Sequence, residues 1–197
     1  MVEKFVKNLV HKMEQEDLID KGSQEDYVYA YTCMLEKALT IGSILTLSIF
    51  RKDFFPTVLF LVFFFALRRR TGGYHANTFK RCYIGTIIIY LIVSEICQRQ
   101  YNNSIFVLII TVFSLCIIEL IGTINHPNMH MNREELMESK KAARSIGTIE
   151  GLIILILFIN NSSYIYIFYL SNSVILCAVL MCIAKFIKQE VTSNEED

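Results

Sequence analysis

The chain alternates between long apolar runs and short polar segments, and this alternation predicts its secondary structure. Six apolar runs follow one another, at residues 38–50 (extending back through 27–34), 54–67, 83–97, 105–124, 146–159 and 164–187. Such runs predict helices, and about 20 apolar residues are needed to cross the hydrocarbon core of a bilayer unaided. Only the fourth and sixth runs reach that length. We therefore expect about six membrane-spanning helices, with four spans plus two partial ones as the alternative.

The first 25 residues follow a different pattern. Apolar side chains recur there at helical spacing, while charged side chains occupy the opposite face; the apolar positions are Phe5, Val6, Leu9, Val10 and Met13. This spacing predicts an amphipathic helix that is broken by the polar residues 20–23. The helix is expected to lie either in the membrane interface or against the cytosolic face of the protein itself.

Composition limits the class of protein. The chain has 197 residues, of which 53% are hydrophobic, and its mean hydropathy is +0.42. These values exclude a soluble domain with a polar surface and favour one all-α polytopic integral membrane domain over residues 1–197. The formal net charge is zero, so no overall field attracts nucleic acid, and no nucleic-acid partner is expected. The acidic tail, residues 188–197, is expected to be disordered.

The distribution of basic residues predicts the orientation in the membrane. If both termini are cytosolic, sixteen of the nineteen Lys and Arg residues fall on cytosolic segments and only Arg51, Lys52 and Arg99 fall outside. Basic residues stay preferentially on the cytoplasmic side of a membrane. We therefore expect a multi-pass protein of the plasma membrane, with residues 68–82 at its cytosolic boundary. A signal peptide is not expected, because the first thirty residues hold no sustained apolar core.

The segment from Arg68 to Cys82 holds the candidate chemistry. It is basic and broken by glycines, and it carries His75 and Cys82 seven residues apart between two apolar runs. In one unbroken helix these two side chains would be about 10 Å apart along the axis, too far for proton transfer. The backbone must bend between them, as Gly72-Gly73 allows, and a helix beginning near Cys82 would favour its thiolate. The alternative is an ordinary basic loop with an incidental histidine and cysteine.

Part of this segment resembles a known family. Arg69-Arg70, Gly72-Gly73-Tyr74-His75-Ala76 and Cys82 resemble the core motif of the accessory gene regulator protein B family, and the layout of the whole chain is similar too. Members of this family are membrane peptidases that process quorum-sensing propeptides. The resemblance implies that His75 and Cys82 are the catalytic pair and that no cofactor takes part. It also implies that a short amphipathic propeptide is the substrate, that a thiolactone or lactone ring is formed, and that the protein is a homodimer.

A second basic segment adds candidate substrate-binding residues. The charged stretch 134–144 ends in Lys140, Lys141 and Arg144 and is expected to be helical. Together with Arg69 and Arg70 it would form a basic docking surface for an acidic partner peptide, although such a stretch is usually just a solvated face. Gly72 and Gly73 are expected to contact the substrate through their backbone amides, as possible oxyanion donors.

Several other polar residues are candidate functional groups. Glu95, Glu119 and Glu150 lie within or near the ends of the apolar runs, and Glu150 is the best placed of them to orient His75. His126 and His130 are four residues apart, but Pro127 argues against a shared helix face, so no metal site is expected. The six cysteines show no paired spacing and are expected to be free thiols.

Three other functions remain open on the sequence. A small membrane transporter or exporter component would use the buried acids and leave Cys82 dispensable. A cysteine-dependent acyltransferase would share the nucleophile and carry a lipid on Cys82. A metal peptidase is the weakest of these candidates.

Overall fold

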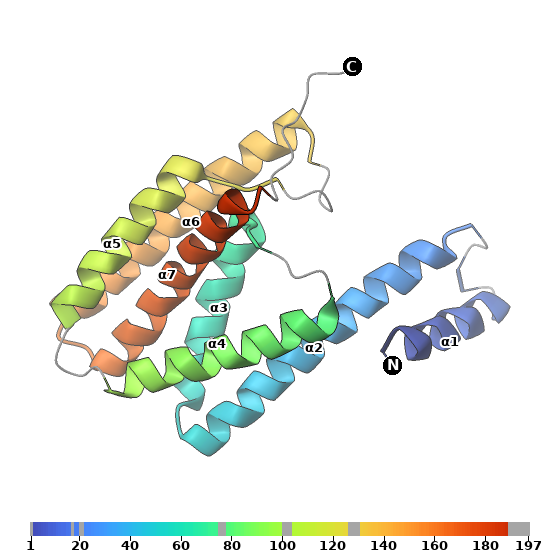
Figure 1. Ribbon diagram of the computed structural model, residues 1–197, viewed down its shortest axis with the longest axis horizontal. Coiled ribbons are helices and arrows are strands. Elements are labelled where there is room, and N and C mark those ends of the chain that lie inside the picture. Colours follow the sequence, from blue (N-terminus) through green and yellow to red (C-terminus); the bar gives the residue numbers. More distant parts are fainter. Residues whose placement is uncertain are drawn as a thin grey trace.

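The computed structural model describes residues 2–16, 18–19, 22–74, 78–99, 104–125 and 131–188. Within these ranges the regular secondary structure is helical throughout, which confirms the all-α class (Figure 1). The helices are α1 (Val2–Gln15), α2 (Gln24–Arg51), α3 (Phe54–Thr71), α4 (Phe79–Arg99), α5 (Ser104–Ile121), α6 (Arg133–Ile159) and α7 (Tyr164–Phe186). Residues 189–197 of the acidic tail lie outside the described residues, and the predicted disorder of the tail stays a prediction.

Each of the six apolar runs lies mainly within one helix, α2 to α7. Among the described residues, α2, α4, α6 and α7 are long and apolar enough to cross a membrane. Helix α5 is shorter than the apolar run 105–124, because it ends at Ile121 and Gly122 adopts a φ of 74°; whether it spans the membrane stays a prediction. Conversely, α2, α4 and α6 gain length from polar turns that continue the apolar runs. The structure therefore supports a membrane protein with four long apolar helices.

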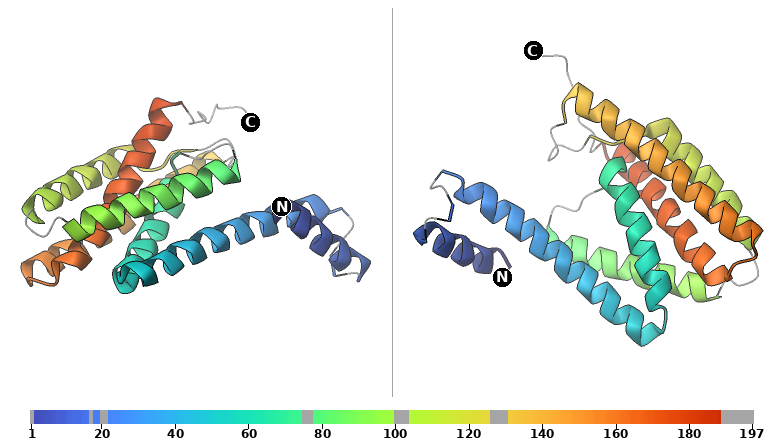
Figure 2. Two further views of the ribbon diagram at one scale, coloured as in Figure 1. Left: turned by 60° about the horizontal axis from the view of Figure 1, so that its bottom comes forward. Right: turned by 180° about the vertical axis from the view of Figure 1, so that it is seen from behind.

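Helices α3 and α7 form the centre of the bundle. They pack along each other, α5 and α6 cover α7, and α6 also contacts α3 (Figures 1 and 2). The interior between these four helices is apolar and closed to solvent. The fully buried side chains there include Leu67, Ile118, Ile154, Val174 and Met181. The central position of α7 therefore fixes both ends of α3, including the end that carries the candidate site.

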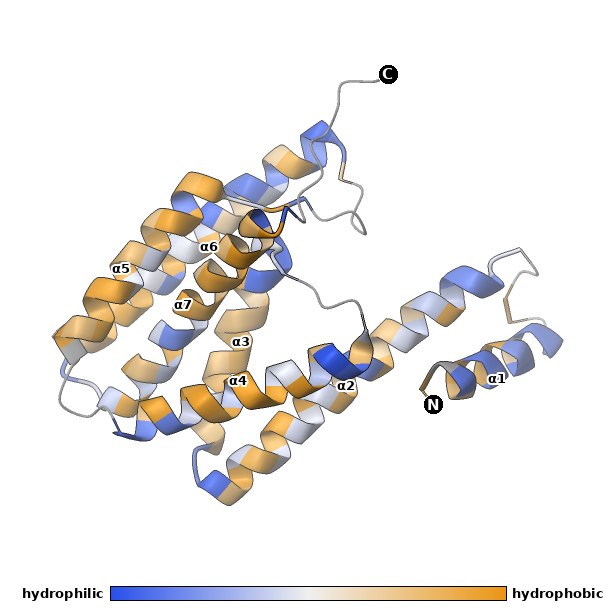
Figure 3. Ribbon diagram, viewed as in Figure 1, coloured by the Kyte–Doolittle hydropathy of each residue, from blue (hydrophilic) through white to orange (hydrophobic). Residues whose placement is uncertain are grey.

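The outward faces of the bundle are apolar rather than polar. Figure 3 shows hydrophobic residues along most of α5, and large side chains such as Phe106, Phe113 and Leu120 are exposed there. Contiguous apolar surface of this kind marks a membrane or partner interface. This agrees with the high mean hydropathy of the chain and supports burial of the bundle in lipid.

Helix α1 is amphipathic, as predicted. Val6 and Val10 are buried against α2, where Val28, Tyr31 and Leu35 pack on them. Thus α1 lies on the protein's own surface. Phe5 and Leu9 remain exposed, so one apolar strip of the helix stays available to a membrane surface.

The turn between α2 and α3 carries a buried polar centre around Asp53, which the sequence did not predict. The Asp53 side chain is 2% exposed. Its carboxyl group accepts hydrogen bonds from side chains of α3, α4 and α7: Thr57 (3.4 Å), Tyr90 (3.2 Å), Ser94 (2.5 Å), Gln98 (3.2 Å) and Tyr169. These bonds join three helices at one end of the bundle and so fix the direction of α4, which carries Cys82.

Candidate active site

The opposite end of the bundle holds the Gly72–Tyr74 segment, where the chain leaves α3. Gly72 and Gly73 have φ angles of 63° and 117°, a region that side chains disfavour. A Cβ atom at Gly72 would lie 2.5 Å from the carbonyl oxygen of Ile124, and one at Gly73 would lie 3.1 Å from that of Leu180. Both positions therefore require glycine for conformation and for space.

Hydrogen bonds fix this segment to three other parts of the bundle. The carbonyl of Arg70 accepts from Thr123 Oγ1 (2.9 Å) and Ser139 Oγ (3.0 Å). The Ile124 amide donates to the carbonyl of Thr71 (2.9 Å), and the Tyr74 amide donates to that of Leu180 on α7 (3.0 Å). The backbone that enters His75 is thus positioned by α6, by α7 and by residues 122–125.

Gly73→Ala should disturb this site more than the fold. The new methyl group needs a disfavoured φ and meets the Leu180 carbonyl, so we expect a cost of about 1–3 kcal/mol, concentrated in the segment. The expected result is impaired turnover in a protein that still inserts in membranes. Limited proteolysis next to residue 73 would measure the loosening. Gly42→Ala is the matched control, because a Cβ there meets nothing within 4 Å.

Arg68 stabilises the same segment from within α3. Its guanidinium donates to the carbonyl oxygens of Gly72 and of Tyr74, the latter at 2.6 Å. By contrast, the side chains of Arg69 and Arg70 are exposed. The sequence shows the three arginines as one basic cluster and does not single out Arg68, because adjacent residues of the same type carry no signal of which one faces inward.

Cys82 lies in the first turn of α4, as predicted. Its amide donates to the carbonyl of Thr78 (3.0 Å), and its side chain is exposed. All six cysteines are free, as expected, and Cys97 and Cys177 are buried. Cys82 is therefore an accessible thiol at a helix N-terminus.

His75 lies outside the described residues, together with Ala76 and Asn77. The break that we predicted between the two candidate catalytic residues is present, since α3 ends at Thr71 and α4 begins at Phe79. Contact between the imidazole and the Cys82 thiol stays a prediction.

The start of α6 lies beside the end of α3, where we predicted a basic docking surface. The Ser139–Arg70 hydrogen bond brings the two elements together. Lys141 is exposed, whereas Lys140 is half-buried because its aliphatic chain packs over Gly122. Arg144 is engaged elsewhere: its Nε lies 3.8 Å from the Glu119 carboxylate and donates to the Glu119 carbonyl (3.0 Å). Arg69, Arg70, Lys140 and Lys141 therefore share one end of the bundle.

The three candidate acids differ in their surroundings. Glu95 pairs with Arg51 (2.9 Å) and Arg99 (2.6 Å), and Glu119 pairs with Arg144, so both have structural partners. Glu150 is 4% exposed, and its Oε2 atom has no hydrogen-bond partner among the residues that the structure describes. It lies eleven residues beyond Ser139 along α6, about 16 Å deeper in the bundle. Its role in orienting His75 stays a prediction, because His75 lies outside the described residues.

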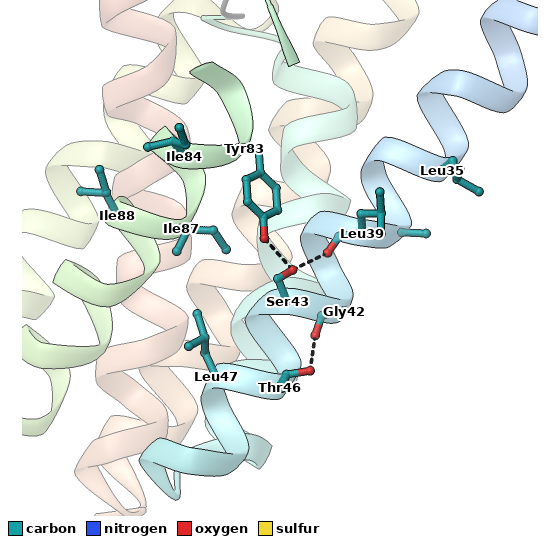
Figure 4. Close-up of a pocket in the computed structure, with 11 residues that line it drawn as sticks. Leu35, Leu39, Gly42, Ser43, Thr46, Leu47, Tyr83, Ile84, Ile87 and Ile88 are labelled. Carbon is teal, nitrogen blue, oxygen red and sulfur yellow. Dashed lines mark hydrogen bonds between the residues drawn. The ribbon is translucent and has the colours of Figure 1, made fainter. Parts of the chain in front are cut away.

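An apolar groove runs between α2 and α4 next to Cys82. Its volume is about 750 Å³, and its walls include Leu39, Leu47, Ile84 and Ile88 (Figure 4). The Ser43 and Tyr83 hydroxyls meet at 2.8 Å inside it. Because Tyr83 directly follows Cys82, one end of the groove adjoins the candidate nucleophile.

No cluster of three or more metal-binding side chains occurs in the described ranges. His126 and His130 fall outside those ranges, so the structure does not test the histidine pair.

Comparison with known proteins gives one match. The family model described as Accessory gene regulator B matches residues 3–188, nearly the whole chain. No curated protein and no solved structure matches the chain.

Proposed function

This chain belongs to the accessory gene regulator B family, and from that membership we propose that it is a membrane-embedded cysteine endopeptidase. Its substrate would be a short amphipathic quorum-sensing propeptide, which it cleaves and helps to cyclise. The observation that carries the proposal is the position of Cys82. It is an exposed thiol in the first turn of a helix, and the chain enters that helix from a fixed segment that leads into His75.

In the proposed reaction His75 removes the proton from the Cys82 thiol, and the thiolate attacks the scissile carbonyl carbon of the propeptide. The carbon–nitrogen bond then breaks, and His75 returns the proton to the departing amine. The upstream part of the substrate stays on Cys82 as a thioester. A thiol or hydroxyl of the same peptide attacks that thioester, which closes the ring and restores the Cys82 thiol.

The membrane boundary suits the second step. Exchange of one thioester for another is nearly isoenergetic, whereas hydrolysis is downhill, so a site with little water protects the intermediate. Holding the substrate nucleophile near the acyl carbon raises its effective concentration above that of water. The first amides of α4 have no acceptor within the helix and are suitable donors to an oxyanion beside Cys82.

The proposal includes an orientation in the membrane. The end of the bundle that carries Gly72–Tyr74 also carries most of the Lys and Arg side chains, whereas Arg51 and Arg99 mark the other end. The positive-inside rule places the first end and both termini in the cytosol, with α2 to α7 as six spans of the plasma membrane. A cytosolic site also keeps the catalytic thiol reduced.

A test of this function uses the purified protein in lipid vesicles with a short amphipathic peptide encoded next to it. We expect mass spectrometry of the trapped enzyme to find part of that peptide as a thioester on Cys82. A lipid on Cys82 would instead indicate an acyltransferase. Peptide export that persists without Cys82, with no cleavage, would indicate a transporter component.

Arg69, Arg70, Lys140 and Lys141 are proposed to bind the acidic part of the propeptide. The Lys140→Gln/Lys141→Gln double variant should raise KM about tenfold and leave kcat within about twofold, since the lost contacts act equally on substrate and transition state. Steady-state cleavage at two salt concentrations measures this. Arg99→Gln, at the other end of the bundle, is the control for loss of an exposed positive charge. An unchanged KM in the double variant would remove these lysines from the binding site.

A further inference from the structure

Arg68 differs from its two neighbours in where its charge lies. The Arg68 guanidinium turns back over the segment that follows α3 and donates to the carbonyls of Gly72 and Tyr74. These two carbonyls flank Gly73, and a Cβ atom at Gly73 would overlap the Arg68 guanidinium. The side chain and the glycine therefore fit together as one structural unit.

The geometry of this contact calls for arginine rather than for any cation. A guanidinium presents its N–H donors in a rigid planar fork, so it can bond two carbonyls that lie two residues apart. A lysine ammonium carries the same charge, but it is a single point on a flexible chain. Arg68→Lys would keep the positive charge, but a single ammonium group would not hold the two carbonyl oxygens at a defined distance from each other.

The Arg68 side chain is half-buried at the end of α3, beside the backbone that leads through Tyr74 to His75. One side chain therefore holds the backbone on both sides of Gly73.

We infer that Arg68 is a positioning residue of the proposed peptidase, which holds the Gly72–Tyr74 segment and so sets where the chain enters His75. This inference rests on the proposed function. It separates Arg68 from Arg69 and Arg70, whose exposed side chains suit contacts with the substrate. Arg68 itself acts through its neighbours and does not touch the propeptide.

Two variants separate the effect of the fork from that of the charge. Arg68→Gln should slow cleavage about a hundredfold, with KM little changed, and should speed limited proteolysis next to residue 73. Arg68→Lys keeps the charge and should still cleave at least about tenfold more slowly, because the segment is no longer held. Peptide mapping by mass spectrometry locates the proteolytic cut.

Arg99→Gln is the control for loss of an exposed arginine and should behave as wild type. Continued protection of buried Cys97 from alkylation shows that each variant is folded. Wild-type rates of proteolysis and cleavage in Arg68→Gln would overturn the inference while leaving the peptidase intact. If the wild-type protein cleaves no propeptide, but Arg68→Gln still speeds proteolysis next to residue 73, the proposed function fails and the positioning of the Gly72–Tyr74 segment by Arg68 stands.

Discussion

Replacing Cys82 with alanine is expected to abolish propeptide cleavage, with a loss of at least about a thousandfold in kcat, because the acyl-enzyme cannot form without the nucleophile. Cys82→Ser should be nearly as inactive, since a hydroxyl is far harder to deprotonate than a thiol. His75→Ala should show a similar loss if the imidazole is the base. Single-turnover cleavage in vesicles, with mass spectrometry of the enzyme, would measure both the rate and the missing thioester.

The controls for this experiment come from the same chain. Cys116 on α5 is also an exposed thiol, so Cys116→Ala removes comparable chemistry far from the proposed site and should cleave normally. The side chain of Cys82 is exposed, so its replacement by alanine should leave insertion and thermal unfolding unchanged. Normal processing by Cys82→Ala would rule out the proposed mechanism.

Replacing Asp53 with alanine is expected to have the largest effect on stability. The change leaves the hydroxyls of Tyr90, Ser94 and Tyr169 without their shared acceptor, and all three side chains are buried. Removing one partner from a buried polar network costs about 3–5 kcal/mol. We expect a large drop in the thermal unfolding temperature in detergent, with α4 loosening from α7 first.

The local effect of Asp53→Ala can be read from the buried cysteines. Cys97 on α4 lies in the same core cluster as Tyr90 and Tyr169, whereas Cys177 lies in the other large cluster. Alkylation should therefore reach Cys97 at a lower temperature than Cys177.

Asp53→Asn keeps an acceptor oxygen and should lose less stability. Glu95→Gln removes a solvent-exposed carboxylate and should change the unfolding temperature little. Equal stability of Asp53→Ala and wild type would show that the network is not structural.

The sequence by itself determined the class of the protein and the position of its helices. The six apolar runs, the spacing of Phe5 to Met13 and the glycines after Arg70 are local patterns, and local patterns set where helices begin and end. The placement of Cys82 in the first turn of a helix followed from them. The motif around Gly72-Gly73 and Cys82 indicated the family, which the match over residues 3–188 then showed.

Helix lengths were less predictable. Polar turns lengthen α2 and α6 without contributing to an apolar run, and Gly122 ends α5 where the hydrophobic pattern continues. The pattern counts apolar side chains, whereas a helix needs only its own backbone hydrogen bonds to continue.

The tertiary structure alone decided which polar side chains act together. Asp53 and Tyr169 are bonded across 116 positions of the chain, and Ser139 reaches Arg70 across 69. No local pattern records such contacts, because they depend on how α3, α6 and α7 pack. The same packing turns Arg68 towards Gly72 and Tyr74, leaves Arg69 and Arg70 exposed, and places Glu150 deep in the bundle. A side chain's neighbours are set by the fold, while the sequence fixes only its chemistry.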